Sequence, residues 1–92
     1  MKMVERRQIH FRGQVQGVGF RYTAVSVARR YAITGYVQNL SDGRVVLVAE
    51  GDLSELDRYV ADLSAEMTGY IRETQTERQR ATGEFTSFGV RY

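Results

Sequence analysis

The sequence has 92 residues and a formal net charge of +2 at pH 7, and 42% of its residues are hydrophobic. This length supports one domain with a buried core but not two, and so small a charge gives no indication of a nucleic-acid partner. The absence of cysteine excludes a disulfide scaffold and fits a reducing compartment, and no apolar run approaches the roughly 20 residues of a membrane span. No signal-peptide pattern precedes the domain. We expect a cytoplasmic protein and a monomer, without a membrane or nucleic-acid partner.

The chain begins with a polar segment followed by an alternating one. Residues 1–6 are polar, and we expect them to be flexible. From Arg7 onwards Ile9 and Phe11 alternate with polar residues, which predicts a half-buried strand. His10 is the only histidine. We expect it to face solvent on this strand and to take no part in catalysis.

A glycine-rich stretch comes directly after this strand, with three glycines between Gly13 and Gly19. Glycine accepts positive φ and lets the backbone approach a ligand closely, so successive N–H groups can point into one concavity. A helix behind the turn adds its unpaired N–H groups and the positive end of its dipole, and Arg21 adds a planar fork of donors suited to phosphate. A plain glycine-rich turn with a surface arginine is the alternative. The first interpretation predicts a phosphoryl cradle formed by the amides of Gln14–Phe20 and by Arg21.

The residues that this loop lacks narrow the chemistry. No Lys-Ser/Thr pair follows the last glycine, which excludes a Walker-type nucleotide loop, and Val15 stands where a phosphoenzyme cysteine would lie, six residues before Arg21. No Asp, Glu or His in the loop could protonate a leaving group or hold a metal. The substrate must therefore have a leaving group that departs unaided. A carboxylate, whose conjugate acid has a pKa of about 4, meets this condition and an alkoxide does not.

Two helices and four strands are predicted after the loop. Apolar residues at helical spacing predict a helix over residues 22–32, and a second helix starts at Asp52, where the pattern Asp52-Leu53-Ser54-Glu55 has the form of a capping box. A strand over 36–40 leads through an Asp-Gly turn into 44–50, which is apolar on both faces and typical of a central strand.

Two further strands complete the chain. Residues 70–80 are β-prone but highly charged, which favours an edge strand, and residues 87–92 alternate as a last short strand. The order βαββαβ with a short final strand predicts an α+β fold, the ferredoxin-like α/β sandwich, with an antiparallel sheet and two helices on one face.

Two strings of residues resemble one family. The string Gly13-Gln14-Val15-Gln16-Gly17-Val18-Gly19-Phe20-Arg21 resembles the signature loop of the acylphosphatase family, which hydrolyses carboxyl phosphates to carboxylate and inorganic phosphate. This resemblance implies a small acyl phosphate as substrate, inorganic phosphate as product, and neither metal nor cofactor. It implies phosphate binding by Val15, Gln16, Gly17, Val18, Gly19, Phe20 and Arg21. The string Gly35-Tyr36-Val37-Gln38-Asn39 is similar to the family's second signature and implies that Asn39 holds the attacking water.

The resemblance covers residues 8–51 and 85–92 and weakens between them. Family members commonly have a Gly-Pro turn before the fourth strand, whereas this chain has Met67-Thr68-Gly69 there. The packing of the fourth strand is therefore left open. Two alternatives to an enzyme remain: an RNA-binding domain of the same element order, which would need exposed aromatic residues on its central strands, and a non-catalytic anion-binding module of a larger protein. We expect a free-standing enzyme from the length of the sequence.

Overall fold

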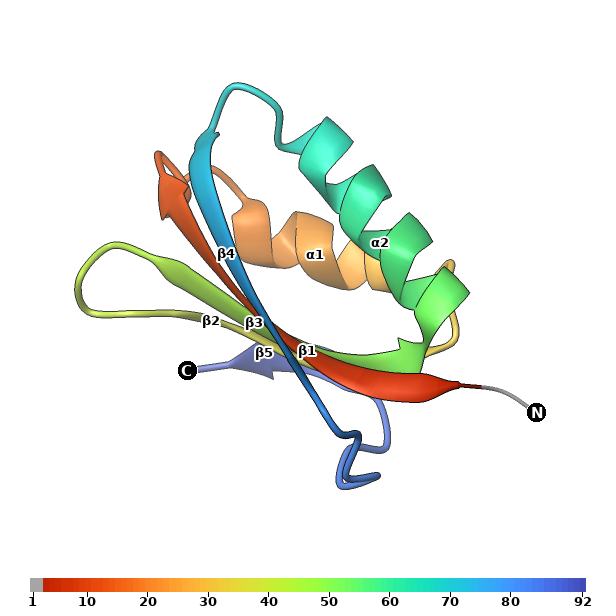
Figure 1. Ribbon diagram of the computed structural model, residues 1–92. Coiled ribbons are helices and arrows are strands. Elements are labelled where there is room, and N and C mark those ends of the chain that lie inside the picture. Colours follow the sequence, from red (N-terminus) through yellow and green to blue (C-terminus); the bar gives the residue numbers. More distant parts are fainter. Residues whose placement is uncertain (1–2) are drawn as a thin grey trace.

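The computed structural model describes residues 3–92. A five-stranded sheet in the order β4-β1-β3-β2-β5 carries both helices on one face (Figure 1). The strands are β1 Val4–Gly13, β2 Ile33–Asn39, β3 Val45–Asp52, β4 Ile71–Gln79 and β5 Phe88–Arg91, and the helices are α1 Phe20–Ala28 and α2 Leu53–Glu66. The ferredoxin-like sandwich is confirmed, with β3 in the centre of the sheet and β4 at one edge, as predicted.

The sheet is mixed rather than wholly antiparallel. The β1–β3, β1–β4 and β2–β3 pairs are antiparallel, but β5 runs parallel to β2. The direction of β5 follows from the connection before it. Residues 80–87 lead to a β5 that starts at the same end of the sheet at which β4 stops. β5 therefore runs antiparallel to β4, which is also the direction of β2. The prediction of an antiparallel sheet was therefore wrong for this one edge strand.

The bounds of several elements differ from the predicted ones, among them those of β1, α1 and β2. β1 begins at Val4, which pairs with Asp52, and not at Arg7; residues 1–2 lie outside the described residues. α1 starts two residues early and stops at Ala28 instead of residue 32, because the next N–H groups close a tight turn onto Val27 and Ala28. β2 starts at Ile33 and includes Gly35, which was expected to precede the strand. At Gly35 φ is +143°, and a Cβ atom would lie 1.8 Å from the carbonyl oxygen of Val48.

The capping box predicted for α2 does not form. Asp52 is the N-cap residue, but its side chain makes no capping hydrogen bond. Its carboxylate instead accepts a hydrogen bond from the hydroxyl of Ser54 at 2.9 Å. The carboxylate of Glu55 turns away from the helix start and accepts a hydrogen bond of 2.7 Å from the backbone N–H of Ala32. Glu55 thus ties the α1–β2 connection to α2.

The core lies between the sheet and the two helices. Alternate residues of β1, β2 and β3 face the helices, and Tyr59 of α2 donates a 2.8 Å hydrogen bond to the carbonyl of Ala24 in α1. The buried cluster comprises Ile9, Phe11, Val15, Phe20, Ala24, Val27, Ala28, Ile33, Val37, Val45, Leu47, Ala49, Leu56, Tyr59, Leu63 and Met67. Neither helix of the described chain has the length and apolar character needed to cross a membrane.

The segment 80–87 lies against the face of the sheet that the helices leave open, and a buried carboxylate holds it there. Glu50 is 5% exposed. It accepts hydrogen bonds of 2.9 Å from the backbone N–H groups of Thr82 and Gly83, and one of 2.6 Å from Nε of Arg6. Burial alone would raise the pKa of Glu50, but these hydrogen bonds outweigh it and lower the pKa to about 2.

Candidate active site

The loop between β1 and α1 is anchored at both ends. At its start, the backbone N–H of Gln14 donates a 2.9 Å hydrogen bond to the carbonyl of Tyr70. The side chains of Val15 and Phe20 are 1% and 2% exposed and join the core. Between them, Gly17 and Gly19 have φ angles of +77° and +80°, a left-handed conformation that favours glycine. The loop is therefore held by packed side chains while its backbone turns sharply.

After Gln14, the backbone N–H groups of this loop have no hydrogen-bond partner among residues 3–92. Within residues 3–92, none of the N–H groups from Val15 to Tyr22 donates to a protein acceptor. Gly19 is the N-cap residue of α1 and provides no side-chain cap, so the first turn of the helix keeps its free donors. Gln14 was predicted to contribute an amide as well, but its N–H is occupied by Tyr70. The available donors therefore begin at Val15, and together with the positive end of the helix dipole they make a surface that could bind an anion.

Arg21 lies in the first turn of α1 and is half-buried. No carboxylate of the described chain pairs with it. Its guanidinium carbon lies 5.5 Å from the centre of the Tyr92 ring, a distance at which the cation and the ring attract each other. The ring thus attracts the guanidinium, whose charge has no carboxylate counter-ion among residues 3–92.

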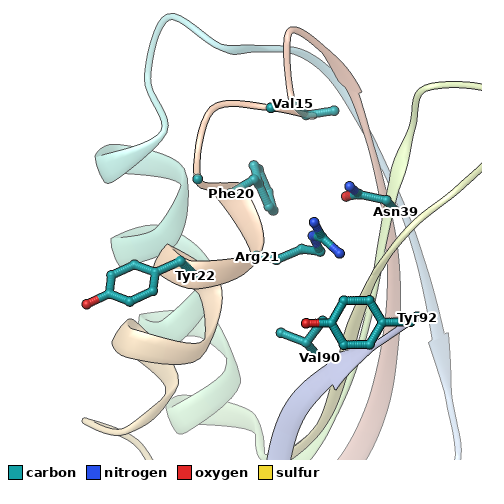
Figure 2. A pocket seen from close by; sticks show the side chains of 9 residues that line it. Val15, Phe20, Arg21, Tyr22, Asn39, Val90 and Tyr92 are labelled. Atoms are coloured by element: carbon teal, nitrogen blue, oxygen red, sulfur yellow. The ribbon is translucent and has the colours of Figure 1, made fainter.

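Asn39 is the last residue of β2 and reaches the same place from the other side. Figure 2 shows its side chain and that of Arg21 pointing toward each other. The amide oxygen of Asn39 is buried and has no hydrogen-bond partner within the described chain. Because an unpaired buried acceptor costs about 1–3 kcal/mol, a ligand or water that reached this oxygen would remove that cost.

A cavity of about 320 Å³ joins the loop, Arg21 and Asn39. It is lined by Val15, Gly17, Gly19, Phe20, Arg21, Tyr22, Asn39, Val90 and Tyr92. Tyr22, Val90 and Tyr92 were not predicted as site residues. Val90 and Tyr92 reach the cavity because β5 pairs with β2, which places Val90 opposite Val37, two residues before Asn39. The alternation of the last strand was visible in the sequence, but its pairing partner was not.

Two residues predicted to bind phosphate do not line the cavity. Val18 packs against the core. The side chain of Gln16 turns toward the β2–β3 connection and donates to the carbonyls of Leu40 and Arg44 at 2.7 and 2.9 Å. Only the backbone of these two residues belongs to the candidate site.

The cavity contains no acid, base or metal-binding cluster. Within the described chain, its lining includes no Asp, Glu, His, Cys or Lys. No group of three or more such potential metal ligands (His, Cys, Asp or Glu) occurs among residues 3–92. His10 lies half-buried on β1 and is not part of the lining. The arrangement can bind an anion and orient a small polar molecule beside it.

Fold and cavity together define a ferredoxin-like sandwich with a candidate anion site on a strand-to-helix loop, and comparisons identify its family. The acylphosphatase family model matches residues 7–90. An acylphosphatase of Methylococcus capsulatus is 44% identical over 85% of this chain and 86% of its own length. This chain belongs to the acylphosphatase family, and hydrolase activity follows from that membership.

Solved structures give the same result. The crystal structure of acylphosphatase from Bacillus subtilis superposes with a TM-score of 0.88 at 30% identity, covering 98% of this chain and all of the other. Full-length HypF, in a phosphate- and nucleotide-bound form, superposes with a TM-score of 0.85 at 26% identity. That match covers all of this chain but 12% of HypF. The same fold therefore occurs alone and as part of a much longer protein.

Proposed function

We propose that this chain hydrolyses small acyl phosphates by direct attack of a water molecule on phosphorus. The water oxygen forms a bond to phosphorus while the bond between phosphorus and the acyl oxygen breaks. The acyl group leaves as a carboxylate, and the protons of the water stay on the phosphate or pass to solvent. The products are a carboxylate and inorganic phosphate.

The phosphoryl group binds to the free N–H groups of the loop and to Arg21. Its equatorial oxygens carry the negative charge in the transition state, and donors fixed in advance stabilise that charge without having to reorganise. What supports this role is the run of N–H groups from Val15 to Tyr22 that have no partner among residues 3–92. The guanidinium of Arg21 supplies the positive charge, and it pairs with no carboxylate among residues 3–92.

Asn39 orients the attacking water. An amide can accept a hydrogen bond from the water with its oxygen and so aim a lone pair of the water at phosphorus. The single observation that carries this proposal is the buried amide oxygen of Asn39, which has no partner in the described chain and shares a cavity with Arg21. A water bound there would satisfy that oxygen.

The leaving group explains why an acyl phosphate is the substrate. The described lining offers no carboxylic acid or imidazole that could protonate an alkoxide. A carboxylate needs no such proton, since its conjugate acid has a pKa of about 4. The substrate therefore supplies the good leaving group that the site cannot create.

Replacement of Arg21 by Gln tests the proposal. We expect inorganic phosphate to inhibit the wild type competitively. In the variant, phosphate affinity measured by calorimetry should fall about tenfold or more, and kcat/KM on a small acyl phosphate should fall on the order of 100-fold. Arg29→Gln, at an exposed arginine just after α1, is the matched control and should change neither. Wild-type protein without acyl phosphate turnover would refute the proposed reaction, and unchanged phosphate affinity in Arg21→Gln would place the anion elsewhere.

A further inference from the structure

Gln16 makes a contact that neither phosphate binding nor water orientation explains. It belongs to the phosphate loop, yet its side-chain nitrogen donates to two carbonyls of the β2–β3 connection, Leu40 at 2.7 Å and Arg44 at 2.9 Å. Both amide protons of Gln16 are therefore used, and both acceptors belong to a segment more than 20 residues away along the chain.

The two acceptors close the end of the hairpin that carries Asn39. Leu40 follows Asn39 directly, and Arg44 precedes Val45, the residue that pairs with Asn39 across the two strands. The N–H of Leu40 also donates to the carbonyl of Arg44 at 2.8 Å. One side chain thus holds both strands of the hairpin at the level of Asn39.

We propose that Gln16 is a positioning residue that sets the distance between the bound phosphoryl group and the water held by Asn39. This inference rests on the proposed function. The loop binds phosphorus, β2 carries the water, and the amide of Gln16 joins the two bodies by direct hydrogen bonds. In-line attack depends on such spacing, and an error of about 1 Å can cost on the order of 100-fold in rate.

The cradle itself does not need this side chain. Its shape depends on Val15 and Phe20 in the core and on the left-handed glycines Gly17 and Gly19. The loss of the Gln16 amide should therefore leave phosphate binding intact and disturb only the alignment of the water. This expectation separates a positioning role from a role in building the phosphate site.

A double-mutant cycle tests the inference. Gln16→Met keeps the length of the side chain without its donors, and Gln16→Asn keeps the amide but is one methylene too short to reach. In the wild-type background each should lower kcat on the order of 10- to 100-fold while phosphate affinity changes less than about threefold. In the Asn39→Ala background, where no water is held, the same substitutions should lower kcat less than about twofold further. Gln75→Met, at an exposed position of β4, makes the Met substitution far from the site and should have no effect.

The outcomes are distinguishable. Equal loss of kcat in both backgrounds would overturn the inference, because Gln16 would then act independently of Asn39. A fall in phosphate affinity that matches the fall in kcat/KM would also overturn it, because Gln16 would then shape the cradle. If Gln16→Met does not fold, Gln16→Asn gives the same comparison. Wild-type turnover and the single Asn39→Ala variant test the proposed function separately from any Gln16 result.

Discussion

Replacement of Asn39 by Ala should separate catalysis from binding and from stability. In the proposed mechanism, Arg21 and the loop amides contact phosphate in both the ground state and the transition state. The amide of Asn39 contacts only the water in that mechanism, and this contact matters once attack begins. Removal of an interaction that exists only in the transition state lowers kcat and kcat/KM by similar factors. We expect a loss on the order of 100-fold, equivalent to about 2.7 kcal/mol of transition-state stabilisation.

The structure also sets the expected effect on folding. The amide oxygen of Asn39 is buried and has no partner in the described chain, so the wild-type protein bears a cost of about 1–3 kcal/mol wherever no water satisfies it. Alanine removes that atom. The free energy of unfolding should therefore stay unchanged or rise by about 1 kcal/mol, although activity falls.

Steady-state kinetics on a small acyl phosphate, phosphate calorimetry and urea unfolding measure the three quantities. Ser41→Ala is the matched control, since Ser41 is exposed on the same connection and outside the cavity lining. A folded Asn39→Ala protein with near wild-type kcat would refute the water-orienting role. A parallel loss of phosphate affinity would show instead that Asn39 contacts the phosphoryl group.

Two further predictions concern metal and pH. Activity should survive EDTA, because an arginine and backbone N–H groups supply the positive charge of the proposed site; loss of activity that magnesium restores would contradict this. Alkyl phosphates should be poor substrates, because the site offers no acid to protonate the leaving alkoxide; fast cleavage of an alkyl phosphate would contradict that reasoning. Hydrogen bonds that outweigh burial lower the pKa of Glu50 from 4.5 to about 2. The contribution of Glu50 to the free energy of unfolding is therefore complete above pH 4.5 and is lost as the pH falls toward 2. The total loss is on the order of 3 kcal/mol. Urea unfolding from pH 6 to 2 should show this loss in the wild type and a flatter profile in Glu50→Gln, and equal slopes would exclude Glu50 as its source.

The parts of the site that a local string of residues defines could be predicted. Gly17 and Gly19 take the left-handed conformation that the glycine spacing indicated, and α1 begins directly behind them. The order of elements predicted the fold, because hairpin-forming strands and two one-sided helices have few ways to pack. Arg21 and Asn39 were expected at one site from the family resemblance, and they line one cavity.

What could not be predicted depends on contacts between distant segments. The pairing of β5 with β2 brings Val90 and Tyr92 to the cavity, and no local pattern indicates the partner of an edge strand. The direction of the Gln16 side chain is equally non-local, since its acceptors are carbonyls that any residue would offer. The failed capping box has the same cause: the carboxylate of Glu55 is taken by a backbone N–H from another connection.

The position of β4 in the sheet separates its sequence from the candidate site. β1 and β3 separate β4 from β2, the strand that carries Asn39. The side chains of β4 beyond Ile71 are all exposed, and their charges protect the free edge from pairing with another chain. The segment before β4 meets the phosphate loop through one backbone hydrogen bond, from Gln14 to Tyr70, which any residue at position 70 could accept. The proposed phosphate binding and water orientation therefore depend on the β1–α1 loop and the β2–β3 hairpin, and not on the exposed side chains of β4.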